Sequence, residues 1–185
     1  GAPNDGSGGS IFFYYGQPGG LFSPQPDRTI SNPTHSDYMG YALTICDFNN
    51  DNYPDMAAGV IYAEETNASQ QQGSVKIFYG SSEGFADTND QEIYGKRLTG
   101  PANTWQAEQN LYLGEKLASG DFDGDGDCDL AAFQSNYNWA GGAVLLYEGS
   151  TGSGLSNEPV IHWAPVDGID GSLLLRDVDQ DGLAD

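Results

Sequence analysis

Apolar residues gather in short runs along the chain, and turns rich in glycine, proline or acidic residues separate one run from the next. Residues 75–79, 130–133 and 143–147 are such runs. Apolar and polar positions alternate imperfectly in residues 75–79, which is typical of strands covered on both faces. Because no segment shows a sustained helical period with capping residues, the pattern predicts an all-β protein of many short strands.

The chain repeats two kinds of segment. One kind is acidic and occurs as DFNNDNYPDMAAG (47–59), DFDGDGDCDLAAF (121–133) and DVDQDGLAD (177–185). The other kind contains a glycine-rich turn and occurs as GSIFFYYGQPGGL (9–21), GSVKIFYGSSEGF (73–85) and GAVLLYEGSTGSGL (142–155). The two kinds alternate, and each acidic segment is preceded by a short segment that contains apolar residues, at 41–45, 115–119 and 172–175. Such internal similarity is the signature of a repeat architecture.

The spacing of the acidic segments indicates the size of the repeat. Asp47 and Asp121 lie 74 positions apart, and Asp121 and Asp177 lie 56 apart. These periods suit a four-stranded blade and are too long for leucine-rich or ankyrin units. We expect the order strand, acidic loop, strand, variable loop, strand, glycine turn, strand. In the second period the strands fall near 114–120, 129–137, 142–147 and 159–163. We predict one domain, 1–185, with periods at about 1–58, 59–132 and 133–185.

The composition supports a folded domain with a lopsided charge. Hydrophobic residues make up 38% of the 185 residues, and 27 acidic residues face 6 basic ones, for a net charge of −21. Nucleic acid is excluded as a partner, because phosphate binding needs clustered lysine and arginine. No apolar run is long enough to insert in a membrane. The acidity reflects either solubility and adaptation to salt, or carboxylates concentrated to hold cations.

Each acidic segment begins with nine residues that we call loop one (47–55), loop two (121–129) and loop three (177–185). Positions one, three, five and nine carry oxygen-bearing side chains, eleven of them aspartate and one asparagine. These residues are Asp47, Asn49, Asp51, Asp55, Asp121, Asp123, Asp125, Asp129, Asp177, Asp179, Asp181 and Asp185. Position seven varies, as a backbone carbonyl ligand would allow, and is Tyr53, Asp127 or Leu183. Position six is Asn52, Gly126 or Gly182, residue types that tolerate a left-handed turn.

Carboxylates at alternating positions of one loop repel each other strongly unless a cation lies between them. Hard oxygen ligands in a turning loop suit Ca²⁺, whereas Mg²⁺ requires stricter octahedral geometry. Zn²⁺ prefers histidine or cysteine, and both histidines, His35 and His162, lie outside the loops. An EF-hand would need glutamate at position twelve, where Ala58 and Ala132 stand. We expect about three structural Ca²⁺ ions, one per loop, each between two neighbouring antiparallel strands; a solvated acidic turn without metal is the alternative.

The segment from Met39-Gly40 to Gly59, with loop one inside it, resembles the FG-GAP repeat of integrin α-subunit β-propellers and of related bacterial VCBS-type proteins. Gly1-Ala2-Pro3 resembles the GAP element itself, and the resemblance covers nearly the whole chain. The sequence departs from the repeat at three places, Leu113-Gly114, Asp170-Gly171 and Phe133. The resemblance implies four-stranded blades around a central axis, with calcium in the hairpin between the first two strands of each blade.

Three periods are too few for a closed propeller, which usually needs four to eight blades. Open sheet edges would remain, and these are an aggregation liability. We therefore expect either that the chain is part of a longer propeller or that it associates with copies of itself, since two copies would supply six blades. Two cysteines, Cys46 and Cys128, allow at most one internal disulfide, and the sequence leaves open whether it forms.

We expect no catalytic activity. Cations would hold the loop aspartates ionised, which makes them poor general acids. His35 and His162 are interpreted as structural or exposed residues, and the chain has no P-loop, dinucleotide-binding glycine motif or CxxC. Recognition residues concentrate on loops, and the longer variable stretches are 22–38, 64–72, 86–112 and 134–141. Their aromatic residues either bind a sugar or a protein partner or pack between blades; they are Tyr38, Trp105, Tyr112, Tyr137 and Trp139.

Two hypotheses for the function follow. The first is an extracellular or cell-surface propeller module, stabilised by calcium, that serves adhesion or recognises a protein or carbohydrate ligand. A structural role in a surface layer or filament is a variant of it. The second is a non-catalytic propeller portion of a secreted polysaccharide-degrading enzyme. Extracellular calcium would saturate weak sites, whereas resting cytosolic calcium would not fill them.

Overall fold

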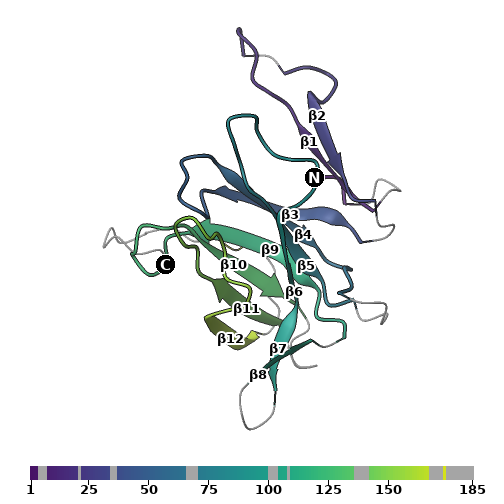
Figure 1. The fold of residues 1–185 in the computed structure, drawn as a ribbon. Helices are drawn as coiled ribbons and strands as arrows, with labels where there is room; N and C mark the ends of the chain where they lie inside the picture. The colour runs from purple at the N-terminus through teal and green to yellow at the C-terminus, as the bar shows by residue number, and fades with distance from the viewer. Residues whose placement is uncertain are drawn as a thin grey trace.

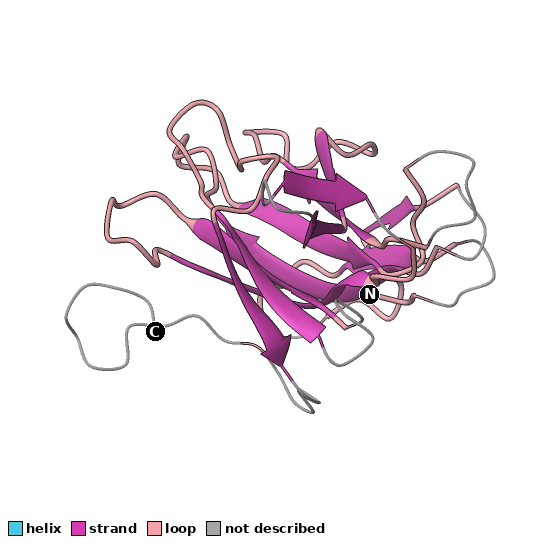
Figure 2. Cartoon of the chain, turned by 90° about the horizontal axis from the view of Figure 1, so that it is seen from below, coloured by secondary structure: helices cyan, strands magenta, loops and turns pink. Residues whose placement is uncertain are grey.

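A computed structural model describes residues 1–3, 8–20, 22–33, 37–65, 71–99, 104–107, 109–135, 142–166 and 173. All regular elements in these ranges are β-strands, as Figures 1 and 2 show, and the all-β prediction is confirmed. The strands are β1 Ser10–Phe13, β2 Arg28–Ser31, β3 Met39–Cys46, β4 Asp55–Val60, β5 Ser74–Phe78, β6 Gln91–Tyr94, β7 Lys96–Thr99, β8 Thr104–Ala107, β9 Leu113–Gly120, β10 Asp129–Gln134, β11 Gly142–Tyr147 and β12 Ile161–Val166. No helix long and apolar enough to cross a membrane occurs in the described part of the chain.

Two four-stranded antiparallel sheets form the body of the molecule (Figure 1), and in each the strands follow chain order. Sheet one contains β3, β4, β5 and β6, and sheet two contains β9, β10, β11 and β12. Loop one joins β3 to β4 and loop two joins β9 to β10, so the predicted strand-to-strand placement of both loops is confirmed. The strand predicted at 142–147 matches β11, whereas the one predicted at 159–163 begins two residues later, as β12.

Equivalent backbone contacts recur one repeat apart. A Cβ added at Gly59 would overlap the carbonyl oxygen of Gly114, and one at Gly1 would overlap that of Gly40. Only glycine allows so close an approach of two backbones. These matching contacts make the β1–β2 hairpin the counterpart of β5–β6. The boundaries of the three periods themselves stay a prediction.

The hydrophobic core is layered between the sheets. β9 packs against β3 and β4, and the largest cluster of buried side chains, which includes Ile77, Leu130 and Leu145, fills the space between sheets one and two. A second cluster, which includes Ile11 and Met56, joins the β1–β2 hairpin to the other face of sheet one. This stacking is compatible with propeller blades. However, the described residues form no closed ring of sheets, so the arrangement around an axis stays a prediction.

The stretch 86–112 is not one variable loop, as the sequence predicted, because it contains β6, β7 and β8. Likewise, the predicted loop 22–38 contains β2. Among the described strands, β6 pairs with β5 alone, and β7 and β8 pair with each other alone. Strands with one neighbour tolerate polar residues such as Gln91 and Glu92, and so they lack the apolar runs by which the sequence analysis located the central strands.

Candidate metal centre

The first aspartate of each described loop folds the loop around its own carboxylate. Asp47 accepts hydrogen bonds from the backbone N–H groups of Asp51 (3.0 Å) and Asn52 (2.8 Å). Asp121 in loop two accepts from Gly126 (3.0 Å), the same position six, and from Gly124 (2.7 Å) at position four instead of position five. The two loops therefore share one local fold.

Each described loop turns through two left-handed residues. Position six is one of them, with φ of 70° at Asn52 and 92° at Gly126, as the sequence predicted. Position four is the other, with φ of 54° at Asn50 and 80° at Gly124. The sequence analysis missed this second turn, although asparagine and glycine at position four were the signal that could have revealed it.

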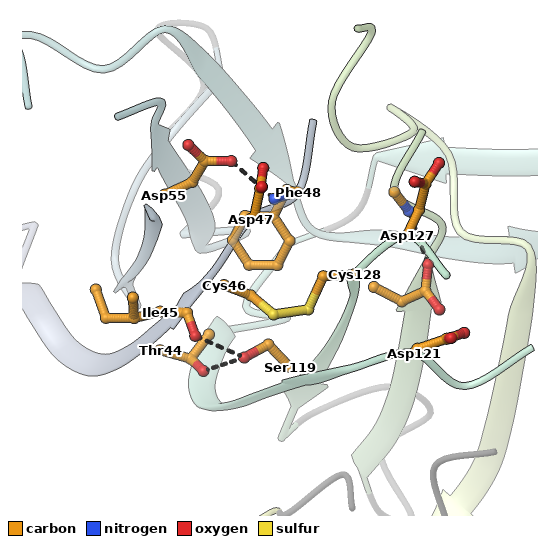
Figure 3. Close-up of a disulfide and its surroundings, with 12 residues drawn as sticks. Thr44, Ile45, Cys46, Asp47, Phe48, Asp55, Ser119, Asp121, Asp127 and Cys128 are labelled. Carbon is orange, nitrogen blue, oxygen red and sulfur yellow. Dashed lines mark hydrogen bonds between the residues drawn. A yellow bond between two sulfur atoms is a disulfide. The ribbon is translucent and has the colours of Figure 1, made fainter. Parts of the chain in front are cut away.

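The last aspartate of each loop anchors the loop to the sheet below. Asp55 and Asp129 are buried. Asp55 accepts from the backbone of Phe48 (2.7 Å; Figure 3) and of Gly80 (2.7 Å). Asp129 accepts from Phe122 (2.9 Å) and Gly149 (2.8 Å).

Position nine thus connects loop one to the turn after β5, at Gly80, and loop two to the turn after β11, at Gly149. Burial raises the pKa of Asp55 and raises that of Asp129 to about 6, while the two backbone donors at each residue oppose the rise. Neighbouring loop carboxylates, such as Asp123 beside Asp129, add to it. The charged form of each position-nine carboxylate is therefore destabilised by burial and by its acidic neighbours, and a bound cation would offset much of that free-energy cost.

Loop two brings its carboxylates together in the way a hard cation needs. One oxygen each from Asp121, Asp123 and Asp129 lies within 4.8 Å of the others. Two ligands at about 2.4 Å from one Ca²⁺ ion can be at most about 4.8 Å apart, so the set fits that ion. Within the described ranges, this is the one group of three or more acidic, histidine or cysteine side chains gathered so closely.

The other two acidic residues of loop two differ in their contacts. Asp125 accepts a hydrogen bond from the backbone of Asp127 (2.8 Å). The carboxylate of Asp127 accepts from the backbone N–H of Thr151 (2.8 Å) and from the side chain of Asn50 (2.8 Å) in loop one. These contacts, with the Thr151 hydroxyl, lower the pKa of Asp127. With its carboxylate engaged elsewhere, Asp127 could offer a cation its backbone carbonyl, as the sequence predicted.

Loop one has the same fold but one carboxylate fewer at positions one, three, five and nine, because Asn49 stands where loop two has Asp123. The loop-one residues that correspond to Asp121, Asp123 and Asp129 are Asp47, Asn49 and Asp55. The Asn49 amide donates to Asp51 (3.0 Å), and the side chain of Tyr53, at position seven, is exposed. All five candidate residues of loop three lie outside the described residues: Asp177, Asp179, Asp181, Leu183 and Asp185.

A disulfide between Cys46 and Cys128 joins the ends of the two loops (Figure 3), with Cα atoms 6.2 Å apart. Beside it, the hydroxyls of Thr44 and Ser119 lie 2.6 Å apart, and Ser119 also donates to the carbonyl of Ile45 (3.3 Å). Strand β3 of sheet one and strand β9 of sheet two are thus held together next to the acidic loops. The sequence left the existence of this bridge open, and the structure contains it.

The predicted recognition aromatics are only partly described. Tyr38 and Tyr112 each stack edge-on against Tyr62, with ring centroids 5.0 and 5.7 Å apart. Tyr38 and Tyr112 precede β3 and β9, so they lie at the strand ends away from loops one and two. Tyr137, Trp139 and His35 fall outside the described residues, and the side chains of Trp105 and His162 are not among those described.

Comparison with known proteins gives partial matches. No family model matches the chain. The chain is 32% identical over 134 residues to phosphatidylinositol-glycan-specific phospholipase D of Rattus norvegicus, covering 66% of the chain and 14% of that protein. It is 29% identical over 114 residues to integrin alpha-3 of Mus musculus, covering 57% of the chain and 10% of that protein. The chain therefore spans about a seventh or less of the length of these relatives.

The match to an integrin α subunit agrees in part with the resemblance of the acidic repeats to FG-GAP repeats. This distant similarity suggests an extracellular β-propeller-like module, and together with the aspartate cluster of loop two it hints at binding of a divalent cation. The disulfide is consistent with an extracellular location, because disulfides persist in oxidising compartments.

Proposed function

We propose that the chain is a calcium-binding, extracellular β-propeller module without catalytic activity, which serves adhesion or the recognition of a protein or glycan ligand. The observation that carries the calcium proposal is the gathering of Asp121, Asp123 and Asp129 in loop two. The repetition of the same oxygen-bearing positions in loops one and three supports it. The similarity to an integrin α subunit supports the extracellular, propeller-like context.

In this proposal each loop holds one ion through the side chains at positions one, three, five and nine and the carbonyl at position seven. The ion supplies positive charge to a carboxylate cluster that would otherwise repel itself. Asp129 and Asp55 also connect the loop to the following hairpin, so the ion would stabilise the fold rather than take part in a reaction. This structural role favours a module whose binding surface lies elsewhere.

We place the recognition surface at the strand ends opposite the loops. The half-buried tyrosine group of Tyr38, Tyr62 and Tyr112 offers aromatic rings, each with a polar hydroxyl tip. Such residues suit contacts with a sugar ring or a protein side chain. The module would then work either as part of a longer propeller or together with further copies of the chain.

A second candidate function rests on the similarity to phosphatidylinositol-glycan-specific phospholipase D. The chain spans 14% of that protein, which is compatible with a non-catalytic part of a larger secreted enzyme, whether a phospholipase or the polysaccharide-degrading enzyme predicted from the sequence. A structural part of a surface layer or filament is a variant of the first function.

Calorimetric titration with CaCl₂ tests the calcium proposal. We expect saturable binding that Asp121→Asn weakens, whereas Glu64→Gln, which removes one exposed charge at the end of β4 away from loop one, leaves it unchanged. Absence of heat, together with no calcium in the purified protein by elemental analysis, would refute it. A glycan array and a protein-partner screen, each with and without a Tyr62→Ala variant, then test the recognition surface.

A further inference from the structure

The Cys46–Cys128 bridge lies directly beside a candidate ligand in each of two loops. Cys46 immediately precedes Asp47, the first residue of loop one, and Cys128 immediately precedes Asp129, the last residue of loop two. Both cysteines pack against the central hydrophobic cluster between the sheets. Movement of one loop end is therefore transmitted through a covalent bond to the other loop (Figure 3).

The carboxylate of Asp127 forms a second connection between the loops. It accepts from the backbone (2.8 Å) and the hydroxyl (3.0 Å) of Thr151, and from the side chain of Asn50 (2.8 Å). Asn50 is the left-handed residue at position four of loop one. Asp127 belongs to loop two by sequence but holds a turning point of loop one.

The turn at residues 149–152 forms a third connection, because both loops bind it. Gly149 donates to Asp129 of loop two (2.8 Å). At the other end of the turn, Gly152 donates to the carbonyl of Asn49 in loop one (2.7 Å). The turn is therefore hydrogen-bonded to both loops at once.

From these three connections we propose that loops one and two bind Ca²⁺ as a coupled pair, in which a cation in one loop raises the affinity of the other. The inference rests on the proposed calcium binding. The first ion orders the shared bridge, the Asp127 contacts and the 149–152 turn, so the second ion has less left to order. Repulsion between the two ions opposes the coupling, but the surplus of negative charge on the chain and the salt of the solution weaken it.

Hydrogen exchange read by mass spectrometry during a calcium titration tests the coupling, because peptides from loops one and two report separately. Asp121→Asn removes a carboxylate oxygen from loop two and leaves loop one intact. We expect this variant to raise the calcium midpoint of loop one by about fivefold, the lower end of typical coupling between sites. Glu64→Gln, the matched loss of one charge, is expected to leave that midpoint unchanged.

The connection itself is tested in a second background. With Asp127→Asn present, we expect disabling loop two to move the midpoint of loop one much less. In a Cys46→Ala/Cys128→Ala background, disabling loop two should likewise move the loop-one midpoint less. If that double variant fails to fold, the Asp127→Asn background still tests the coupling. A loop-one calcium midpoint that is unchanged by Asp121→Asn would overturn the coupling while leaving calcium binding intact. If calcium does not slow hydrogen exchange in either loop of the unaltered chain, calcium binding itself is refuted, and the coupling with it.

Discussion

Loops one and two have nearly the same nine-residue pattern and the same two left-handed turns, yet loop two gathers three carboxylates within 4.8 Å, whereas loop one has Asn49 in place of the middle one. The loops differ also in what surrounds them. Loop one lies against loop two and the turn at 149–152, where Asp127 accepts from Asn50 and Gly152 donates to Asn49. Through Asp55, loop one also binds the turn at Gly80. The arrangement of a repeated loop therefore depends on its neighbour as well as on its own sequence.

Removing calcium should have the largest effect on this pair of loops. At a free calcium concentration about a hundredfold above Kd, each filled loop adds about 2.7 kcal/mol to the free energy of unfolding. For two loops we expect chelation to lower the melting temperature by about 10–20 °C. Scanning calorimetry with calcium and with chelator measures the shift. If loop two is the stronger site, Asp121→Asn should abolish more than half of it, and identical melting curves with and without calcium would contradict the proposal.

Loss of the disulfide should have the next largest effect, and it should weaken both loops alike. The bridge closes 82 positions of sequence, and bridges that close long loops typically contribute about 2–4 kcal/mol. We expect Cys46→Ala/Cys128→Ala to lose that much stability in urea denaturation with chelator present. A loss below about 0.5 kcal/mol would mean that the remaining contacts between β3 and β9 suffice.

The position-nine aspartates separate anchoring from cation binding. Asp55→Ala and Asp129→Ala each leave two backbone N–H groups without their acceptor, which should cost about 2–3 kcal/mol in the calcium-free protein. With chelator present, the two variants should lose the same amount of stability. In calcium, Asp129→Ala should lose more, since Asp129 belongs to the gathered set. Denaturation curves under both conditions test this, and equal losses in calcium would remove the contrast between the loops.

Changing position four should have the smallest effect on stability. Asn50→Gly gives loop one the residue that loop two has at Gly124, so the left-handed backbone is retained while the contact with Asp127 is lost. We expect the melting temperature to stay close to that of the unaltered chain, while exchange at the Gly152 amide becomes faster. Asn50→Ala is the comparison, because a left-handed alanine costs about 1 kcal/mol or more. A large loss for the glycine variant would show that the Asn50 side chain itself stabilises the fold.

The sequence predicted the described acidic loops well because their alignment isolates the positions that recur. The strand–loop–strand setting and the left-handed position six followed from residue types alone. The hydrogen bond between the Asp127 carboxylate and Asn50 could not be predicted, because Asn50 lies 77 positions away in the sequence. The edge strands β6, β7 and β8 escaped prediction for a related reason: a strand with one neighbour has little apolar surface to reveal it.

The Cys46–Cys128 bridge has one more consequence, which concerns cleavage of the chain. It turns residues 46–128 into a closed covalent ring that contains β4, β5, β6, β7, β8 and β9. A single cut by a protease anywhere between Asp47 and Asp127 would open this ring without releasing a fragment. A cut between the two loops would leave both loops intact, and the nicked molecule would migrate as one species until it is reduced.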